Sequence, residues 1–325
     1  MTGVAVGETH LTAVSASGLR AECTLRVVAP PDGLALDQAE ITLILGKDVA
    51  LTLAAHPLPE DAGTLRYSSS DPAIASVDAL SGVVTPRKIG DCSITVSTYD
   101  GRFTETCAVH ADGLLRGVKI GIDPGHQLHH DSEKERSTPK GGKMKAKVAV
   151  GGRGKVSKTE EYVINLQVGL RMREELEMLG AEVKMTRTTH DVNISNKQRA
   201  LMMNDFGADL VLRLHCNAWK SSKPNGISMM VSKSWGQPEE SLRAARLLMS
   251  RMLEATGASN RGISSTDYYT GNNWSTVPCI LVEMGFLTNA REDRLLNNAE
   301  YQETLSHSMI DAICDYMGRE RPTIW

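Results

Sequence analysis

The spacing of apolar residues divides the chain into two parts with different periodicities. In the first part, over residues 34–110, short apolar or alternating segments such as AEITLIL (39–45) and VALTLAA (49–55) follow one another. Alternation with a period of two is typical of strands that are buried on one face. Turn dipeptides separate such segments, namely Asp71-Pro72, Ser81-Gly82 and Asp100-Gly101. Regularly spaced short strands predict an all-β sandwich for this part.

From residue 117 onward, strand patterns alternate with helical patterns. Residues 118–122 alternate, and the segments ADLVLRLH (208–215) and CILVE (279–283) carry nearly continuous apolar runs. A continuous apolar run is expected of a central strand that is covered on both faces. The second part is therefore predicted to contain a buried sheet.

The helices of this part are predicted from apolar residues three and four positions apart. They span 160–180, 196–206 and 240–256, and two more helices carry the chain to about residue 317. Ser195 and Gln198 before and within the second helix have the spacing of a capping box. Strands alternating with helices predict an α/β domain with a central, mostly parallel sheet flanked by helices.

A polar segment interrupts this alternation between the first strand and the first helix. Residues 127–158 are rich in Lys, Arg and Gly and have no clear apolar period. We expect a long loop here, and loops of this length are usually functional or disordered.

An internal repeat lies near the start of the chain. Gly7 corresponds to Gly90 and Gly18 to Gly101, with the same offset in both pairs and similar strand patterns around them. A fixed period is typical of tandem modules. We therefore expect the end of a truncated module over 1–29, a complete β module over 30–112, and the α/β domain over 113–320, in a fragment of a longer chain.

Composition and charge narrow the function classes. The formal net charge of −3 over 325 residues argues against a general nucleic-acid-binding protein. We find no apolar run of 18 residues, so no transmembrane segment is predicted, and no signal peptide is visible at the N-terminus. Cys92 and Cys107 lie on the two arms of the hairpin around Asp100-Gly101 and would form a cross-strand disulfide if the register allowed it.

Four side chains that can bind a metal or transfer protons are predicted to meet at one edge of the sheet. His126 follows the first strand, while His215 and Glu283 end two later ones. Glu161 begins the first helix, whose N-terminus should return to the same edge. Carboxyl ends of strands in an α/β sheet are where ligands gather. Two histidines and two glutamates are the inventory of a catalytic zinc site, with three ligands and one carboxylate that moves protons.

Each of these residues has a structural explanation when it is taken alone. A single histidine at the end of a strand is more often a structural residue, and Glu161 is a favourable first-turn glutamate. Glu283 is harder to explain in this way, because it lies inside the apolar run ILVEMGF (280–286). A buried carboxyl is costly unless it is paired, bound to a metal or functional. Together, the four residues favour a metal site.

Two stretches of sequence identify resemblances to known families. Residues 67–96, YSSSDPAIASVDALSGVVTPRKIGDCSITV, are similar to the bacterial Ig-like group 2 module, and the likeness extends over about 34–110. It implies a spacer or an adhesive unit of a secreted or surface protein.

Residues 117–318 resemble the amidase_3 type of zinc-dependent N-acetylmuramoyl-L-alanine amidases. Four stretches carry that resemblance, namely KIGIDPGHQ (119–127), EEYVINLQVGLRMREELEMLGAEVKMTR (160–187), RALMMNDFGADLVLRLHCNA (199–218) and VPCILVEMGFLTNAREDRLL (277–296).

The resemblance implies a role for each candidate residue. It makes His126, Glu161 and His215 the ligands of one Zn²⁺ ion and Glu283 the catalytic carboxylate. Glu160 remains an alternative to Glu161. The family places its glutamate four residues before an asparagine, which here is Asn165 and favours Glu161.

The resemblance also implies a reaction, a substrate and a location. The reaction is hydrolysis of the amide bond between N-acetylmuramic acid and L-alanine in peptidoglycan, in the cell wall of a bacterium or outside the cell. We expect Asn217, Tyr268 and Asn273 to contact substrate, while Trp274 fits a substrate contact and a core position equally well. The Ig-like module is a candidate for binding other wall polymers. Two alternatives remain open, a zinc peptidase that cuts within the stem peptide and a non-catalytic wall-binding protein.

Overall fold

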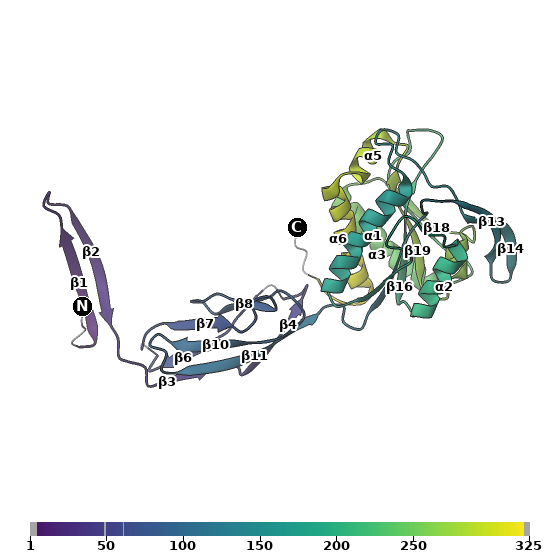
Figure 1. The fold of residues 1–325 in the computed structure, drawn as a ribbon. Helices are drawn as coiled ribbons and strands as arrows, with labels where there is room; N and C mark the ends of the chain where they lie inside the picture. The colour runs from purple at the N-terminus through teal and green to yellow at the C-terminus, as the bar shows by residue number, and fades with distance from the viewer. Residues whose placement is uncertain (1–4, 49, 61, 322–325) are drawn as a thin grey trace. The chain divides into compact units, whose positions relative to one another are not determined.

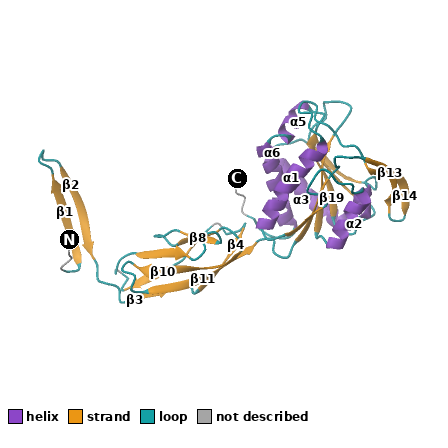
Figure 2. Cartoon of the chain, in the orientation of Figure 1, coloured by secondary structure: helices purple, strands orange, loops and turns teal. Residues whose placement is uncertain are grey.

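A computed structural model describes residues 5–48, 50–60 and 62–321 of the chain. The chain divides into two compact units, with the boundary between Asp112 and Gly113. Each unit is described by itself, and Figures 1 and 2 show that the labelled helices all belong to the second unit, whereas the first is built from strands and loops.

The first unit is strand-rich, as its alternating pattern predicts. Its strands are β1 (Gly7–Val14), β2 (Arg20–Val27), β3 (Gly33–Leu36), β4 (Glu40–Leu45), β5 (Leu51–Thr52), β6 (Ala55–Leu58), β7 (Leu65–Ser69), β8 (Ala75–Val77), β9 (Val83–Pro86), β10 (Gly90–Thr98) and β11 (Thr104–Gly113). They form sheets in the orders β4-β11-β10-β7, β5-β9-β8, β3-β6 and β1-β2. Alternate residues of β10 and β11, among them Ile94, Val96 and Val109, are completely buried in one apolar core.

The hairpin β10–β11 does not form the cross-strand disulfide that was considered. In its register Cys92 lies opposite Val109, and Cys107 lies opposite Ile94. The two cysteines are thus diagonal neighbours, which places their backbones roughly 7–8 Å apart, too far for a disulfide. All six cysteines of the chain lie in the described part and are free thiols.

The second unit contains a mixed six-stranded sheet. Its strands are β12 (Lys119–Pro124), β15 (Glu182–Met185), β16 (Leu210–Asn217), β17 (Ile227–Val231), β18 (Asn260–Ser265) and β19 (Cys279–Phe286), in the order β15-β12-β16-β19-β17-β18. Neighbouring described strands run parallel except for β17, which is antiparallel to β19. The carboxyl ends of β12, β16 and β19 therefore lie at the same edge.

Helices cover both faces of this sheet. They are α1 (Glu161–Met178), α2 (Asn196–Phe206), α3 (Pro238–Thr256), α4 (Thr270–Trp274), α5 (Ala290–Leu296) and α6 (Ala299–Tyr316). On β12, a Cβ at Gly121 would meet Met203 of α2, whereas Ile122 contacts Gly169 of α1. Because successive strand residues point to opposite faces, α1 and α2 lie on opposite faces of the sheet. The α/β prediction is thus confirmed, with a helix-flanked mixed sheet.

Helix boundaries follow the capping signals in the sequence. Ser195 accepts a hydrogen bond from the backbone amide of Gln198, the side chain of Gln198 bonds back to Ser195, and α2 ends at Gly207 in the left-handed conformation. The capping box predicted for this helix is confirmed. It fixes the start of α2, which carries Arg199 toward the end of β12.

Two sequence predictions are wrong in detail. The polar segment is not one long loop, because residues 131–148 form a two-stranded hairpin of β13 (Asp131–Thr138) and β14 (Gly141–Val148). Half of the residues in these two strands are charged and β13 has no apolar residue, so the apolar period is weak. Glu283 does not end its strand either, since β19 continues to Phe286.

Among the described helices, none combines the length and the apolar character needed to cross a membrane.

Candidate metal centre

The turn after β12 brings the first histidine to the sheet edge. A Cβ on Gly125 would overlap the imidazole ring of His215, so the closeness of that ring requires glycine at this position. His126 follows with φ of 59°. This left-handed conformation is uncommon for a residue with a side chain, and such outliers persist only where the surroundings enforce them.

Three side chains converge at this turn. Oε1 of Glu161 lies 3.3 Å from Nε2 of His126 and 3.0 Å from Nδ1 of His215. The candidate ligand atoms of the three residues all lie within 4.8 Å of one another. They come from the β12 turn, the first residue of α1 and the end of β16, which are the places predicted from the sequence.

Backbone groups hold these side chains in place. Nδ1 of His126 donates to the carbonyl of Ala149 at 2.9 Å, so the lone pair of this ring is on Nε2. Glu161 accepts backbone hydrogen bonds from Gly152 at 2.6 Å and from Cys216 at 3.0 Å. Hydrogen bonds of this kind fix the orientation and tautomer of metal ligands.

The local electrostatics set the charge of each group. Burial opposes ionisation of Glu161, but the two histidines outweigh it and hold the pKa of its carboxyl well below the usual value. Burial lowers the pKa of His215 to about 4, against its hydrogen bond to Glu161. For His126, burial works against the charged form, yet the negative charge of Glu161 raises the pKa above its ordinary value. The centre thus holds an anionic carboxylate between two imidazoles.

Glu283 lies beside this cluster on the neighbouring strand. It pairs in register with His215 across β16 and β19. Burial and the charge of Glu161 raise the pKa of Glu283 well above its usual value, against the attraction of Arg213. Its Oε2 atom is buried and has no hydrogen-bond partner within the described part of the chain. Two neighbouring carboxyls whose pKa values are driven apart are a common basis for acid–base chemistry.

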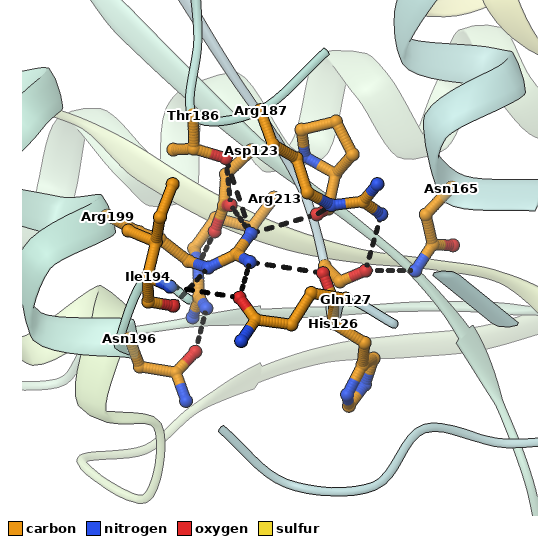
Figure 3. Close-up of polar contacts among 12 residues, drawn as sticks. Asp123, His126, Gln127, Asn165, Thr186, Arg187, Ile194, Asn196, Arg199 and Arg213 are labelled. Carbon is orange, nitrogen blue, oxygen red and sulfur yellow. Dashed lines mark hydrogen bonds and ion pairs between the residues drawn. The ribbon is translucent and has the colours of Figure 1, made fainter. Parts of the chain in front are cut away.

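A buried polar network lies behind the cluster (Figure 3). Asp123 accepts hydrogen bonds from Thr186 at 2.7 Å, from Arg199 at 2.8 Å and from Arg213 at 2.9 Å. Burial alone would raise the pKa of Asp123, but the two guanidinium groups outweigh it and hold the pKa far below the usual value. Arg213 also donates to Asn272 and Asn196, and these hydrogen bonds stabilise its buried positive charge.

The same network holds the backbone of the β12 turn. Arg187 and Arg199 both donate to the carbonyl of Pro124 at 2.9 and 3.0 Å. Arg187 and Asn165 donate to the carbonyl of Gly125, each at 3.1 Å, and Arg199 reaches the carbonyl of His126 at 3.1 Å. Three consecutive carbonyls are thus fixed, which explains how His126 keeps its left-handed conformation. Arg187 and Arg199 thus position the turn that carries His126.

The residues present fit a divalent cation. Two imidazole nitrogens and a carboxylate oxygen lie close together. Only protons or a cation can offset the repulsion between their lone pairs. The donor set of two histidines and one glutamate is known from catalytic zinc sites, which leave a fourth position for water. The unpartnered Oε2 of Glu283 on the adjacent strand is available to such a water.

A cavity of about 520 Å³ opens over the cluster. Asn217 and Tyr268 line it, as do Lys145, Ala146 and Val148 of the hairpin. The sequence analysis did not assign these hairpin residues to the site, because it interpreted their segment as a loop. The alternation of Lys with Met, Ala and Val in GGKMKAKV (141–148) is the signal that could have identified a strand there.

Asn273 is not among the residues that line this cavity. Its side chain is completely buried, and its amide donates to the carbonyls of Ser137 and Asp267 at 2.8 and 2.9 Å. The expected substrate contact is thus wrong for Asn273, which instead joins α4 to the hairpin. Trp274 is half-buried and donates from Nε1 to the carbonyl of Arg136, so it also holds the hairpin.

Glu160, the alternative to Glu161, lies outside the cluster. Its carboxylate pairs with Arg153 at 3.0 Å. Only Glu161 of the two approaches both histidines.

Comparisons with known proteins agree with this geometry. Residues 120–315 match the family model Amidase_3, described as N-acetylmuramoyl-L-alanine amidase. Residues 61–100 match a model described as the immunoglobulin-like domain of intimin. The chain is 29% identical over 156 residues to the N-acetylmuramoyl-L-alanine amidase LytC of Bacillus subtilis, which covers 48% of this chain and 31% of that protein.

Two further likenesses extend the comparison. The probable cell wall amidase LytH of Staphylococcus epidermidis is 25% identical over 204 residues, covering 63% of this chain and 60% of that protein. The chain thus spans less than two thirds of the length of either curated relative. The crystal structure of the amidase Ami1 from Mycobacterium smegmatis superposes with a TM-score of 0.58 at 20% identity, covering 63% of this chain and 98% of that one. At this identity the likeness shows a shared fold.

Proposed function

We propose, from the premise that this chain belongs to the Amidase_3 family of N-acetylmuramoyl-L-alanine amidases, that it hydrolyses the bond between N-acetylmuramic acid and the L-alanine of the stem peptide. The observation that carries the proposal is the convergence of His126, Glu161 and His215 next to the unpartnered carboxyl of Glu283. This arrangement provides a metal-binding set and a separate proton carrier in one cavity.

His126, Glu161 and His215 would hold one Zn²⁺ ion. When bound, zinc supplies a Lewis acid that polarises a carbonyl and lowers the pKa of water toward about 7. The burial of His215 keeps its imidazole neutral, and the hydrogen bond from His126 to Ala149 leaves Nε2 free to coordinate. Glu161 is held ionised and His215 neutral, as a metal requires, whereas His126, whose pKa is raised by Glu161, would release its Nε2 proton when the cation binds.

Glu283 is the residue we assign to proton transfer. Its carboxylate accepts a proton from the attacking water, whose oxygen forms a bond to the lactyl carbonyl carbon. It then returns the proton to the L-alanine nitrogen as the carbon–nitrogen bond breaks. The positive charge of a cation between the ligands would favour the ionised form of Glu283, which burial otherwise opposes. Asn217 and Tyr268 line the cavity and are our candidates for substrate contacts.

We assign residues 30–112 of the first unit to an Ig-like module. The separate core and the match to an immunoglobulin-like model support this assignment. A wall amidase acts outside the membrane, so we propose a secreted or wall-associated protein in which this module binds other wall polymers or acts as a spacer.

Product analysis tests the proposed reaction. Purified protein is incubated with peptidoglycan in the presence of zinc or of a chelator, and the soluble products are identified by mass spectrometry. We expect intact stem peptides with a free L-alanine amine, released only with zinc. Products cut within the stem peptide would instead identify a peptidase, and zinc binding without any cleavage would favour a wall-binding protein.

A further inference from the structure

The hairpin β13–β14 is fixed over the cavity by bonds to two helices. Four hydrogen bonds of 2.8 to 3.0 Å join it to the start of α2 and to α4, and they are Asn196 to Lys147, Lys197 to Glu135, Asn273 to Ser137 and Trp274 to Arg136. Glu135 and Ser137 are buried by this contact. Side chains on this part of the hairpin are therefore held at the cavity rather than extended into solvent.

Lys145 is the cationic side chain that the hairpin brings to the cavity. It lines the same space as His126, Glu161 and Glu283. Its Nζ atom lies 3.1 Å from the centre of the Tyr268 ring and donates to the Tyr268 backbone carbonyl. Both partners are neutral, so they orient the ammonium group without compensating its charge.

Lys145 differs from Lys147, two residues further on, in having no carboxylate partner among the described residues. Lys147 forms an ion pair with Glu133. No carboxylate of the described residues pairs with Lys145, and burial, assisted by Lys143, lowers the pKa of Lys145 below its ordinary value. A partly buried ammonium with no counter-charge is a ready site for an anion.

The place of Lys145 in the cavity indicates where such an anion lies on a substrate. Lys145 lines the same cavity as the candidate metal ligands and Glu283, so an anion that it binds belongs to a part of the substrate close to the scissile amide. We infer that Lys145 is a specificity-determining residue that binds a carboxylate on the residue following L-alanine in the stem peptide. This inference rests on the proposed amidase function.

Two matched substrates test the inference. They are synthetic MurNAc-tripeptides with an amidated C-terminus and a neutral third residue, and they differ only in a carboxylate or a carboxamide at the α position of the second residue. For the wild-type protein with zinc, we expect kcat/KM to be about tenfold higher for the carboxylate, the factor that one charge-assisted hydrogen bond supplies. Equal values for the two substrates would overturn the inference.

Variants then assign the preference to one side chain. Lys145→Met should bring the ratio of the two kcat/KM values close to one, whereas Lys145→Arg should restore it. Lys143→Met removes the same charge from the same strand but at an exposed position, and should keep the wild-type ratio. Zinc content and thermal unfolding verify that each variant is folded.

The outcomes separate this inference from the proposed function. Release of free L-alanine amine from both substrates at equal rates keeps the amidase and removes the role of Lys145. If the ratio of the two kcat/KM values in Lys145→Met equals that of the wild type, Lys145 likewise has no role in the preference. Failure to cleave either substrate contradicts the amidase itself and the inference with it.

Discussion

Two regions at the same end of the sheet hold buried charge in opposite ways. Around Asp123, the two carboxylate oxygens accept hydrogen bonds from Arg199 and Arg213, and the pKa of the carboxyl is far below its usual value. On the next two strands of the sheet, Nε2 of His215 (β16) and Oε2 of Glu283 (β19) are buried without partners in the described chain. The pKa of Glu283 is accordingly raised.

The difference distinguishes a carboxylate that stabilises the fold, Asp123, from a carboxyl that is available for reaction, Glu283. A satisfied buried network resists removal of any one member, because the remaining charge is left uncompensated. An unsatisfied carboxyl costs stability and is retained when it has a function. We therefore expect substitutions in the Asp123 network to destabilise the fold, and substitutions at Glu283 to remove activity without destabilising it.

The largest effect on activity is expected at Glu283. Glu283→Gln keeps the size of the side chain but cannot carry a proton between water and the leaving nitrogen. General acid–base catalysis contributes about 10²- to 10⁴-fold, so kcat should fall by that range. The measurement is the rate of stem-peptide release from peptidoglycan.

Stability gives the control for this variant. Replacing a buried carboxyl that has an unpartnered oxygen should leave the free energy of unfolding unchanged or raise it. Zinc content should stay at the wild-type level, since Glu283 is not one of the three ligands. A Gln variant that is inactive because it has lost zinc or has unfolded would contradict the comparison.

The largest effect on stability is expected at Arg199. Arg199→Met removes hydrogen bonds to Asp123, Pro124 and His126. Breaking a buried ion pair costs about 3–5 kcal/mol, measured by denaturant unfolding. Arg243→Met, at an exposed pair with Glu240, is the matched control and should cost no more than about 1 kcal/mol.

The sequence predicted the candidate site because strand ends and helix starts carry chemistry in α/β folds. His126, Glu161 and His215 come together because parallel strands share one carboxyl edge, and that follows from the alternation of strands and helices. Local signals thus sufficed wherever the apolar period was strong.

The hairpin and its contacts could not be predicted in this way. β13 has no apolar residue, and the alternation in β14 covers only Met144, Ala146 and Val148, so the periodicity that marks a half-buried strand is weak. Its position depends on hydrogen bonds to Asn196, Asn273 and Trp274, which are distant in sequence. Asn273 was consequently taken for a substrate contact, and Lys145 was not considered.

The pH dependence of stability sharpens the comparison further. The pKa of Asp123 is lower in the folded state than the unfolded value of about 3.9, so the unfolded state binds the proton more readily in acid. The contribution of Asp123 is then complete above about pH 4 and decreases as pH falls below it, by on the order of 2 kcal/mol.

Asp123→Asn isolates this contribution from those of other carboxyls. The difference in unfolding free energy between wild type and variant should be constant from pH 7 to about pH 5 and should shrink below about pH 4. Urea unfolding at a series of pH values measures it. A difference that does not change with pH would mean that Asp123 is not held ionised by its arginines.

The smallest effect on the free energy of unfolding is expected for a hydrogen bond that solvent can reach. The indole of Trp274 is half-buried, and its Nε1 donates to the carbonyl of Arg136 at 2.8 Å. Trp274→Phe removes this bond, but water can replace the donor, so the cost should be about 1 kcal/mol. Amide hydrogen exchange should show faster exchange in β13 and β14 and unchanged protection of β12 and β16. If β12 also loses protection, the hairpin supports the buried network itself, and the contrast between the two regions no longer holds.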